Sequence, residues 1–119
     1  MSSMKSTVKK LDDNVIKALT KVCEEAKQHI EGFDWLTHRA DYSNFPASLA
    51  VTCVFLTEHQ LSQAMEQKQD AYLRKQVQKQ MLKAGILLKD VRRNVFFDSE
   101  EACAAGHGGN WDSRLATSH

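Results

Sequence analysis

The sequence is poor in the residues that would restrict its class. It holds one proline, five glycines and three cysteines, and no apolar run approaches the ~18 residues that a membrane-spanning helix needs. The cysteines Cys23, Cys53 and Cys103 lie far apart without a Cys-x-x-Cys pair, which predicts reduced thiols in a cytoplasmic protein rather than a disulfide framework. The polar start of the chain is not followed by a hydrophobic stretch, so we expect neither a secretory signal nor a membrane partner.

An excess of charge is also lacking. Sixteen basic and fifteen acidic side chains leave a net charge of +1, so the whole molecule has no field that would attract a polyanion. Apolar residues make up 42% and charged residues 26%, which are ordinary values for a globular chain. A length of 119 residues suits one domain, and we predict a flexible tail over residues 1–10 and a single globular domain over residues 11–119.

Apolar periodicity predicts a long helix near the amino terminus and a buried strand in the middle of the chain. Apolar residues from Val15 to Ile30 recur at steps of three and four, which predicts a helix over residues 12–30. Residues 48–56 are apolar and β-branched without helical spacing, which is typical of a central strand.

Two further helices are expected after that strand. Thr57 and Gln60 have the spacing of a capping box, so a short helix begins there and runs to about Gln67. Asp70 caps a second helix over residues 70–84, which has one apolar face. Near the carboxyl terminus Asp98 and Glu101 repeat the capping spacing, while the glycine-rich tail beyond them is expected to be irregular. The strand-to-helix junction near Thr57 therefore looks like the one near Asp98, as such junctions usually do.

Two short apolar runs, residues 86–89 and 95–97, flank a polar middle and predict a hairpin. We therefore predict an α+β fold with a small antiparallel sheet of residues 48–56, 86–89 and 95–97. This sheet would pack on the helices over residues 12–30 and 70–84. The alternative is a winged helix, which uses nearly the same elements.

Positive charge is concentrated between Arg74 and Arg93, where seven basic residues stand against the single acid Asp90. At about 100° per residue, the lysines of the helix over residues 70–84 fall on one stripe, opposite its apolar face. Such a stripe suits a phosphate backbone, and it equally suits an ordinary solvated helix face. The residues assigned to a nucleic-acid-binding surface are Tyr72, Lys75, Lys79, Lys83, Arg92 and Arg93.

The order of the predicted elements over residues 12–97 resembles that of winged-helix DNA-binding domains. This resemblance implies that the helix over residues 70–84 enters the major groove and that the hairpin over residues 86–97 forms the wing. Two features depart from the pattern. The strand over residues 48–56 is longer than such a domain needs, and the link between the two helices lacks the usual turn glycine.

A second candidate surface lies in the aromatic segment over residues 33–45, which we interpret as a short helix or compact loop. If it is helical, Trp35, His38 and Tyr42 share a face that suits a ligand pocket or stacked bases. The same trio also suits the rim of a core, with its polar tips hydrogen-bonded. Together with Trp111 in the tail, this segment defines the alternative function, a homodimeric adaptor that binds itself or another protein.

No catalytic or metal-binding group assembles from the sequence. Cys53 lies in an apolar strand, where a thiol is inert, and its pairing with His38 is only a third alternative. Cys103 and His107 supply two potential zinc ligands, and two ligands do not make a zinc site. We therefore expect no catalytic residue, cofactor or metal, and a binding module rather than an enzyme. The choice between DNA and RNA, the oligomeric state and the strand order stay open.

Overall fold

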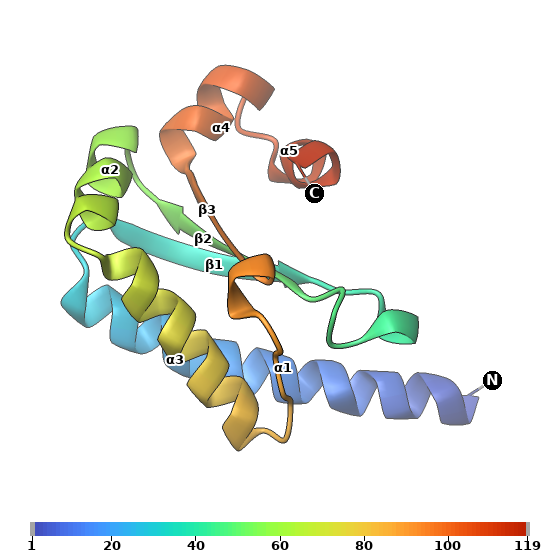
Figure 1. Cartoon of the computed structure of the whole chain (residues 1–119). Helices are drawn as coiled ribbons and strands as arrows, with labels where there is room; N and C mark the ends of the chain where they lie inside the picture. The colour runs from blue at the N-terminus through green and yellow to red at the C-terminus, as the bar shows by residue number, and fades with distance from the viewer. Residues whose placement is uncertain (1, 119) are drawn as a thin grey trace.

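The structure, a computed structural model, describes residues 2–118 of the chain, with side chains described over residues 7–116. Within this range the chain forms five α-helices around a three-stranded mixed sheet (Figure 1). The helices are α1 (Ser2–His29), α2 (Glu58–Glu66), α3 (Gln69–Lys83), α4 (Glu100–His107) and α5 (Trp111–Ser118). The strands are β1 (Phe33–Arg39), β2 (Ala50–Phe55) and β3 (Val95–Ser99), and the 3-10 turns are η1 (Tyr42–Asn44) and η2 (Val91–Arg93).

The long first helix confirms the predicted apolar periodicity. Val15, Leu19, Val22 and Ala26 are all buried, since they lie on the face of α1 that packs against α3 and β1. The helix begins earlier than predicted. The tail expected over residues 1–10 is helical from Ser2 onward, and the first residue lies outside the described range.

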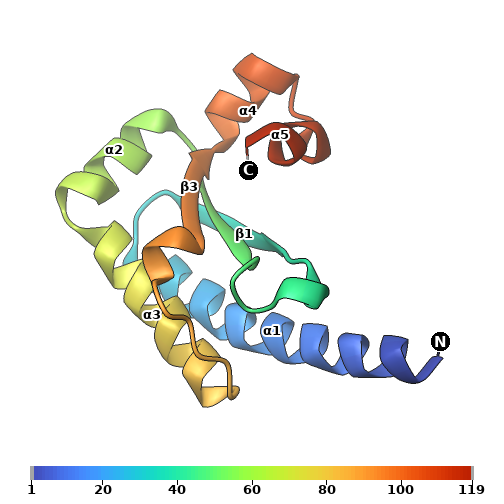
Figure 2. The same cartoon turned by 45° about the vertical axis from the view of Figure 1, so that its right-hand side comes forward.

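The sheet has the order β1-β2-β3, with β2 in the centre as predicted for a doubly buried strand. β1 is antiparallel to β2, whereas β3 is parallel to it. Val51, Cys53 and Phe55 alternate onto the face covered by α1 and α3, where the main core lies. Val54 points to the opposite face, on the side of α4 and α5, so helices cover both faces (Figures 1 and 2).

The α+β class and the packing of a three-stranded sheet on α1 and α3 are confirmed, but one predicted strand is wrong and one strand was missed. Residues 86–89 form no strand within the described chain, and residues 33–39 form the one that was missed. Ile86 and Leu88 are buried in the core, while Leu87 between them is exposed, so this segment alternates without pairing. The alternation of buried and exposed side chains resembles that of a strand, but the segment has no neighbouring strand to pair with in the described chain.

The predicted hairpin is also wrong, and the winged-helix alternative fails with it, because its wing is that hairpin. β3 pairs with β2 through contacts such as Phe55 opposite Ser99. Two parallel neighbours cannot be joined by a tight turn and need a long crossover connection, which α2 and α3 provide here. The sheet is therefore mixed rather than antiparallel.

The second face of the sheet is closed by the carboxyl-terminal part of the chain. The tail predicted to be irregular is helical from Trp111 onward as α5, and α5 packs against α4. Ser99, not Asp98, caps α4, because its hydroxyl oxygen accepts a hydrogen bond from the amide of Ala102. Thr57 caps α2 through the amide of Gln60, as predicted. No helix of the described chain combines the length and the apolar character that crossing a membrane requires.

Candidate nucleic-acid interface

The exposed face of α3 carries the predicted basic stripe. Leu73, Val77 and Met81 are fully buried on the inner side of this helix. A helical turn advances each residue by about 100°, so this burial turns Lys75 and Lys79 outward, and both are exposed together with Lys83. Tyr72, assigned to the same stripe, is half-buried and packs against the core. The prediction that the apolar face of this helix points inward and its lysines point to solvent is therefore confirmed. Tyr72 lies at the border between the two faces.

Two lysines that the sequence reasoning missed join this stripe from α1. Lys17 and Lys21 lie one turn apart on α1 and line a shallow groove against Lys83 of α3. The groove has a volume of about 260 Å³, and its floor is completed by Ala18 and Ala84. No ion pair of the described residues involves any of these three lysines. Three lysines from two helices therefore line one groove without an ion pair in the described part of the chain.

Lys17 and Lys21 carried one sequence signal, their spacing of four residues beside the apolar face of α1. That spacing shows that the two side chains share a flank. It does not show which helix packs along that flank, because the α1–α3 contact depends on the whole fold. The groove could not be assembled from the sequence alone.

The two arginines assigned to the surface lie in η2. Arg92 and Arg93 are both exposed, and both approach Asp90, at 3.3 Å and 3.8 Å. Asp90 also accepts a hydrogen bond from the backbone amide of Arg92, and the side-chain bond to Arg92 holds the pKa of the carboxyl below its ordinary value. Because one carboxylate faces two guanidinium groups, η2 with its cap at Asp90 has a net positive charge.

Arg74, which adds to the positive charge of the segment, has a structural role instead. Its guanidinium lies 2.9 Å from the Asp70 carboxylate and 5.2 Å from the centroid of the Phe97 ring. The ion pair lies within α3, and the cation–π contact with Phe97 ties α3 to β3. Arg74 therefore contributes little to an external basic surface.

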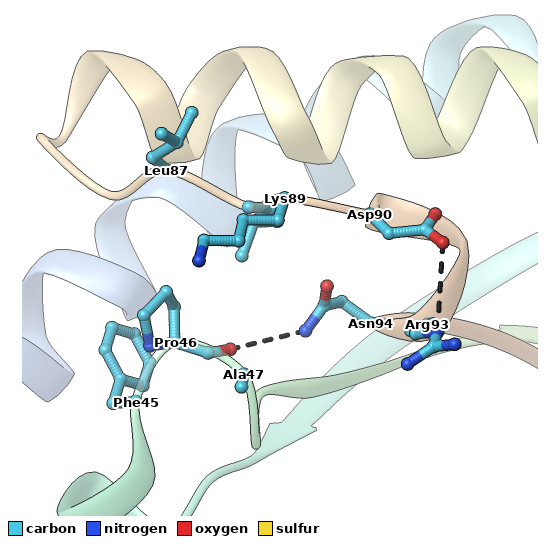
Figure 3. Close-up of a pocket in the computed structure, with 9 residues that line it drawn as sticks. Phe45, Pro46, Ala47, Leu87, Lys89, Asp90, Arg93 and Asn94 are labelled. Carbon is cyan, nitrogen blue, oxygen red and sulfur yellow. Dashed lines mark hydrogen bonds and ion pairs between the residues drawn. The ribbon is translucent and has the colours of Figure 1, made fainter.

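A pocket of about 400 Å³ opens beside this surface (Figure 3). Its apolar walls come from Phe45 and Pro46 on one side and from Leu87 on the other. The ammonium of Lys89 reaches over the opening, and Arg93 lies at the far end. The pocket thus joins the loop before β2 to the segment between α3 and β3, and it combines apolar walls with two cations and the Asp90 carboxylate.

Asn94 forms the polar back wall of the pocket. Its side chain is only 4% exposed, and its amide nitrogen donates to the carbonyl oxygens of Leu49, at 2.8 Å, and Pro46, at 3.3 Å. These two carbonyls fix which end of the amide is nitrogen. The amide oxygen consequently faces away from the loop and into the pocket, as Figure 3 shows.

His38 and Tyr42, predicted as part of a ligand or partner surface, meet at one carboxylate. His38 and Asp12 are 2.9 Å apart, and the Tyr42 hydroxyl donates to the same oxygen of Asp12. These bonds, led by the one with His38, lower the pKa of Asp12, while burial and the carboxylate raise the pKa of Tyr42. Tyr42 also packs on Phe45, with ring centroids 5.1 Å apart, so this network supports the pocket from behind.

The structure does not bring Trp35 into that group, because residues 33–39 form a strand rather than a helix. Successive strand residues point to opposite faces, so Trp35 lies on one face of the sheet and His38 on the other. Trp35 instead meets Trp111 edge to face, with ring centroids 5.1 Å apart. Both indoles donate to Glu100, and both rings are half-buried, so this pair is engaged within the molecule.

The groups considered for chemistry do not form a reactive centre. Cys53 is fully buried, and burial raises the pKa of its thiol to about 12, far from the thiolate state that a nucleophile needs. Over residues 2–118, no three His, Cys, Asp or Glu side chains gather in a way that suits a metal ion. What the described surface offers is a set of cations beside a half-apolar pocket.

Comparison of the chain with protein-family models, with curated proteins and with solved structures finds no match. The fold alone does not specify an activity, because one fold serves many functions. The features of the described surface that bear on function are the groove between α1 and α3 and the pocket around Asn94.

Proposed function

We propose that this chain is a non-catalytic module that binds nucleic acid through the combined surface of α1, α3 and η2. The observation that carries the proposal is the convergence of Lys17, Lys21 and Lys83 on one groove, where none of them joins an ion pair with a described residue. Lys75 and Lys79 continue the positive surface along α3. The module would act in the cytoplasm, where its three free cysteines stay reduced.

The physical basis of such binding is the release of counterions. A nucleic acid holds condensed cations, and each lysine that contacts a phosphate frees part of that atmosphere. The affinity for a single strand then falls with salt, with a logarithmic slope of about −0.7 for each phosphate neutralised. Local clustering makes this possible in a chain whose net charge is only +1, because screening confines the field to about 10 Å at ordinary salt.

Charge reversal on α1 provides a matched test. The Lys17→Glu, Lys21→Glu double variant reverses the groove side of the helix. The Lys9→Glu, Lys27→Glu variant makes the same net change on the opposite flank, where Lys27 lines a different groove beside β1. Fluorescence anisotropy with labelled single-stranded RNA and duplex DNA, at low and physiological salt, would measure the affinities.

We expect the groove variant to lose roughly tenfold or more in affinity at low salt and to show a smaller salt slope. The control variant should bind nearly as the wild type does. Equal losses in the two variants would mean that only net charge matters, and no binding by the wild type at low salt would reject the proposal. Reversal of Lys75, Lys79 and Lys83 together would test the stripe on α3 in the same way.

The adaptor function has support from a different observation. β1 is one of the two edge strands of the sheet, and beside it runs a groove lined by Ile16, Cys23 and Leu36. A strand from a second copy of the chain could extend the sheet at this edge. Trp35 and Trp111 contact each other instead, so a homodimer would use the edge of β1 rather than the tail.

Sedimentation over a range of concentrations would test the homodimer. A dimer that becomes monomeric in an Ile16→Glu variant, and not in a Leu82→Glu control, is the expected result for this function. Ile16 and Leu82 are both exposed apolar residues, but only Ile16 lines the groove beside β1. A wild-type chain that stays monomeric at every concentration would remove the candidate.

A further inference from the structure

We propose that the pocket around Asn94 holds one unpaired nucleotide, with its base between the apolar walls and its phosphate at the cationic mouth. This inference rests on the proposed nucleic-acid function and deepens it. It assigns the bound species as a single strand, or a strand with an unstacked base, because a paired base cannot enter a pocket.

The walls of the pocket suit a flat ring. Phe45 and Pro46 form one side and Leu87 the other, and the volume of about 400 Å³ lies within the range of roughly 300–1,000 Å³ of ordinary ligand pockets. Single-stranded nucleic acids bind proteins by stacking bases on aromatic side chains, since every base has a π-face. Leu87 is 62% exposed although it is apolar, and its side chain points away from Phe45 and Pro46 in Figure 3, so it would turn inward to cover an inserted ring.

The back wall carries a directional acceptor. Both donor hydrogens of the Asn94 amide are directed at the carbonyls of Pro46 and Leu49, so its oxygen faces the pocket in one orientation. An amide oxygen that a ligand covers needs a hydrogen-bond donor, and a ligand without a donor there would leave it unpaired. An exocyclic amino group, such as that of adenine, supplies the donor.

The mouth of the pocket carries the charge that a phosphate needs. Lys89 extends over the opening, and Arg93 approaches from the far end with part of its charge shared with Asp90 (Figure 3). The short segment from Ala84 to Leu88 connects Lys89 to Lys83 of the groove. Ala84 lines the groove and Leu87 lines the pocket, so this segment links the two sites along the chain.

The pocket is formed before any ligand arrives. Tyr42 packs on Phe45 and is itself fixed by Asp12, and Asn94 joins the loop at Pro46 to the turn at η2. Walls that are already ordered lose little conformational entropy on binding. Tyr42 is accordingly a positioning residue, one that acts on the ligand through Phe45.

The first experiment uses three small probes with the whole, isotopically labelled chain. Adenosine 5′-monophosphate has the amino group, purine riboside 5′-monophosphate lacks it, and inorganic phosphate lacks the base. Nuclear magnetic resonance follows the side-chain amide of Asn94 and the backbone amides of Leu87 and Lys89. We expect saturable shifts with the adenosine compound and affinity at least about tenfold lower with the purine riboside compound, because the amide oxygen loses its partner.

The second experiment measures the affinity for a labelled single strand of adenylate in two matched variants. Leu87→Ala opens one wall of the pocket, and Leu82→Ala removes an equally large, similarly exposed side chain, 59% against 62%, from outside it. We expect Leu87→Ala to weaken single-strand binding by about tenfold, the scale of one stacked base, and Leu82→Ala to leave it unchanged. Both positions are exposed, so both variants should fold.

The outcomes separate this inference from the broader function. If phosphate alone shifts the pocket as much as the adenosine compound does, or if Leu87→Ala binds the single strand as the wild type does, the base site is overturned. Salt-dependent binding that still requires Lys17 and Lys21 would then leave the proposed function standing. Equal affinity for the two nucleotides would overturn the role given to Asn94.

Discussion

Trp35 and Trp111 meet at right angles, with an interplanar angle of 86°, and share one carboxylate between them. The indole of Trp35 donates to one oxygen of Glu100, at 2.7 Å, and the indole of Trp111 donates to the other, at 2.8 Å. The contact joins an edge strand to the last helix of the chain. It therefore holds the α4–α5 layer against the second face of the sheet.

Removal of that carboxylate should loosen the layer. In a Glu100→Ala variant both indole nitrogens lose a charged acceptor, and we expect the free energy of unfolding to fall by about 2 kcal/mol. Urea denaturation followed by tryptophan fluorescence would measure the change. Glu25→Ala, an exposed site on α1, serves as the control and should change stability by less than about 0.5 kcal/mol. Equal effects at the two positions would contradict the structural role of Glu100.

The tryptophan contact also marks a limit of reasoning from sequence. Trp35 lies in the segment that was expected to be a helix or loop, because its aromatic residues do not alternate cleanly. The reason is a bulge between Phe33 and Trp35, which shifts the register of β1 against β2 and breaks the period of two. A strand with one extra residue loses the pattern by which strands are recognised.

Local features were predictable where their cause was local. The apolar faces of α1 and α3 and the cap at Thr57 follow from residues within a few positions of one another. Glu101, by contrast, was assigned to the cap of its own helix and instead accepts a hydrogen bond from the amide of Glu58 at the start of α2. The two helix starts are neighbours only because β2 and β3 are parallel, and this pairing joins distant parts of the chain.

In the candidate site, too, one part was predictable from local sequence and the other was not. The stripe of Lys75, Lys79 and Lys83 follows from helical geometry alone. The pocket does not, because it forms where β3 inserts beside β2 and brings Asn94 against the loop at Pro46. The long-range pairing that sequence periodicity could not specify is the step that creates the pocket.

The turn after α1 offers a test of close packing. Gly32 has φ +86°, and a Cβ atom added there would lie 2.6 Å from the side chain of Gln60. Gly85 has a similar φ of +83° but open space around it. We expect Gly85→Ala to cost about 1 kcal/mol from backbone strain and Gly32→Ala about 2 kcal/mol or more, because the contact is added. Chemical denaturation would compare them, and equal losses would show that Gln60 moves aside freely.

The network at Asp12 predicts a dependence of stability on pH. The hydrogen bonds from His38 and Tyr42 lower its pKa below the ordinary 3.8, so the charged form is favoured in the folded chain. This contribution is complete above pH 3.8 and is lost as the pH falls through the lower, folded value. The gap in stability between wild type and Asp12→Asn should therefore be widest near neutral pH and narrow progressively as the pH falls below 3.8.

Denaturation curves at several pH values would measure that gap. Asp13→Asn is the control, since Asp13 makes only an exposed ion pair with Lys9, at 3.4 Å. Its effect should be small at every pH. If the gap for Asp12→Asn stays constant down to pH 2, the carboxylate does not owe its low pKa to the folded network.

Thiol reactivity decides whether the third function, an enzyme built on Cys53, has any place in this fold. Cys53 and Cys103 are buried, whereas Cys23 is half-buried at the groove beside β1. With an aromatic disulfide reagent at neutral pH, we expect Cys23 alone to react in the native state and the other two to react only on unfolding. A Cys23→Ser variant should then show no fast reaction.

Fast reaction that persists in the Cys23→Ser variant would place a reactive thiol inside the sheet or under α4. Such a result would contradict the raised pKa of Cys53, since a thiol held in its protonated form cannot attack quickly. If the Cys23→Ser variant shows no fast reaction, Cys53 is a packing residue of the core, beside Val51 and Phe55 on the inner face of β2.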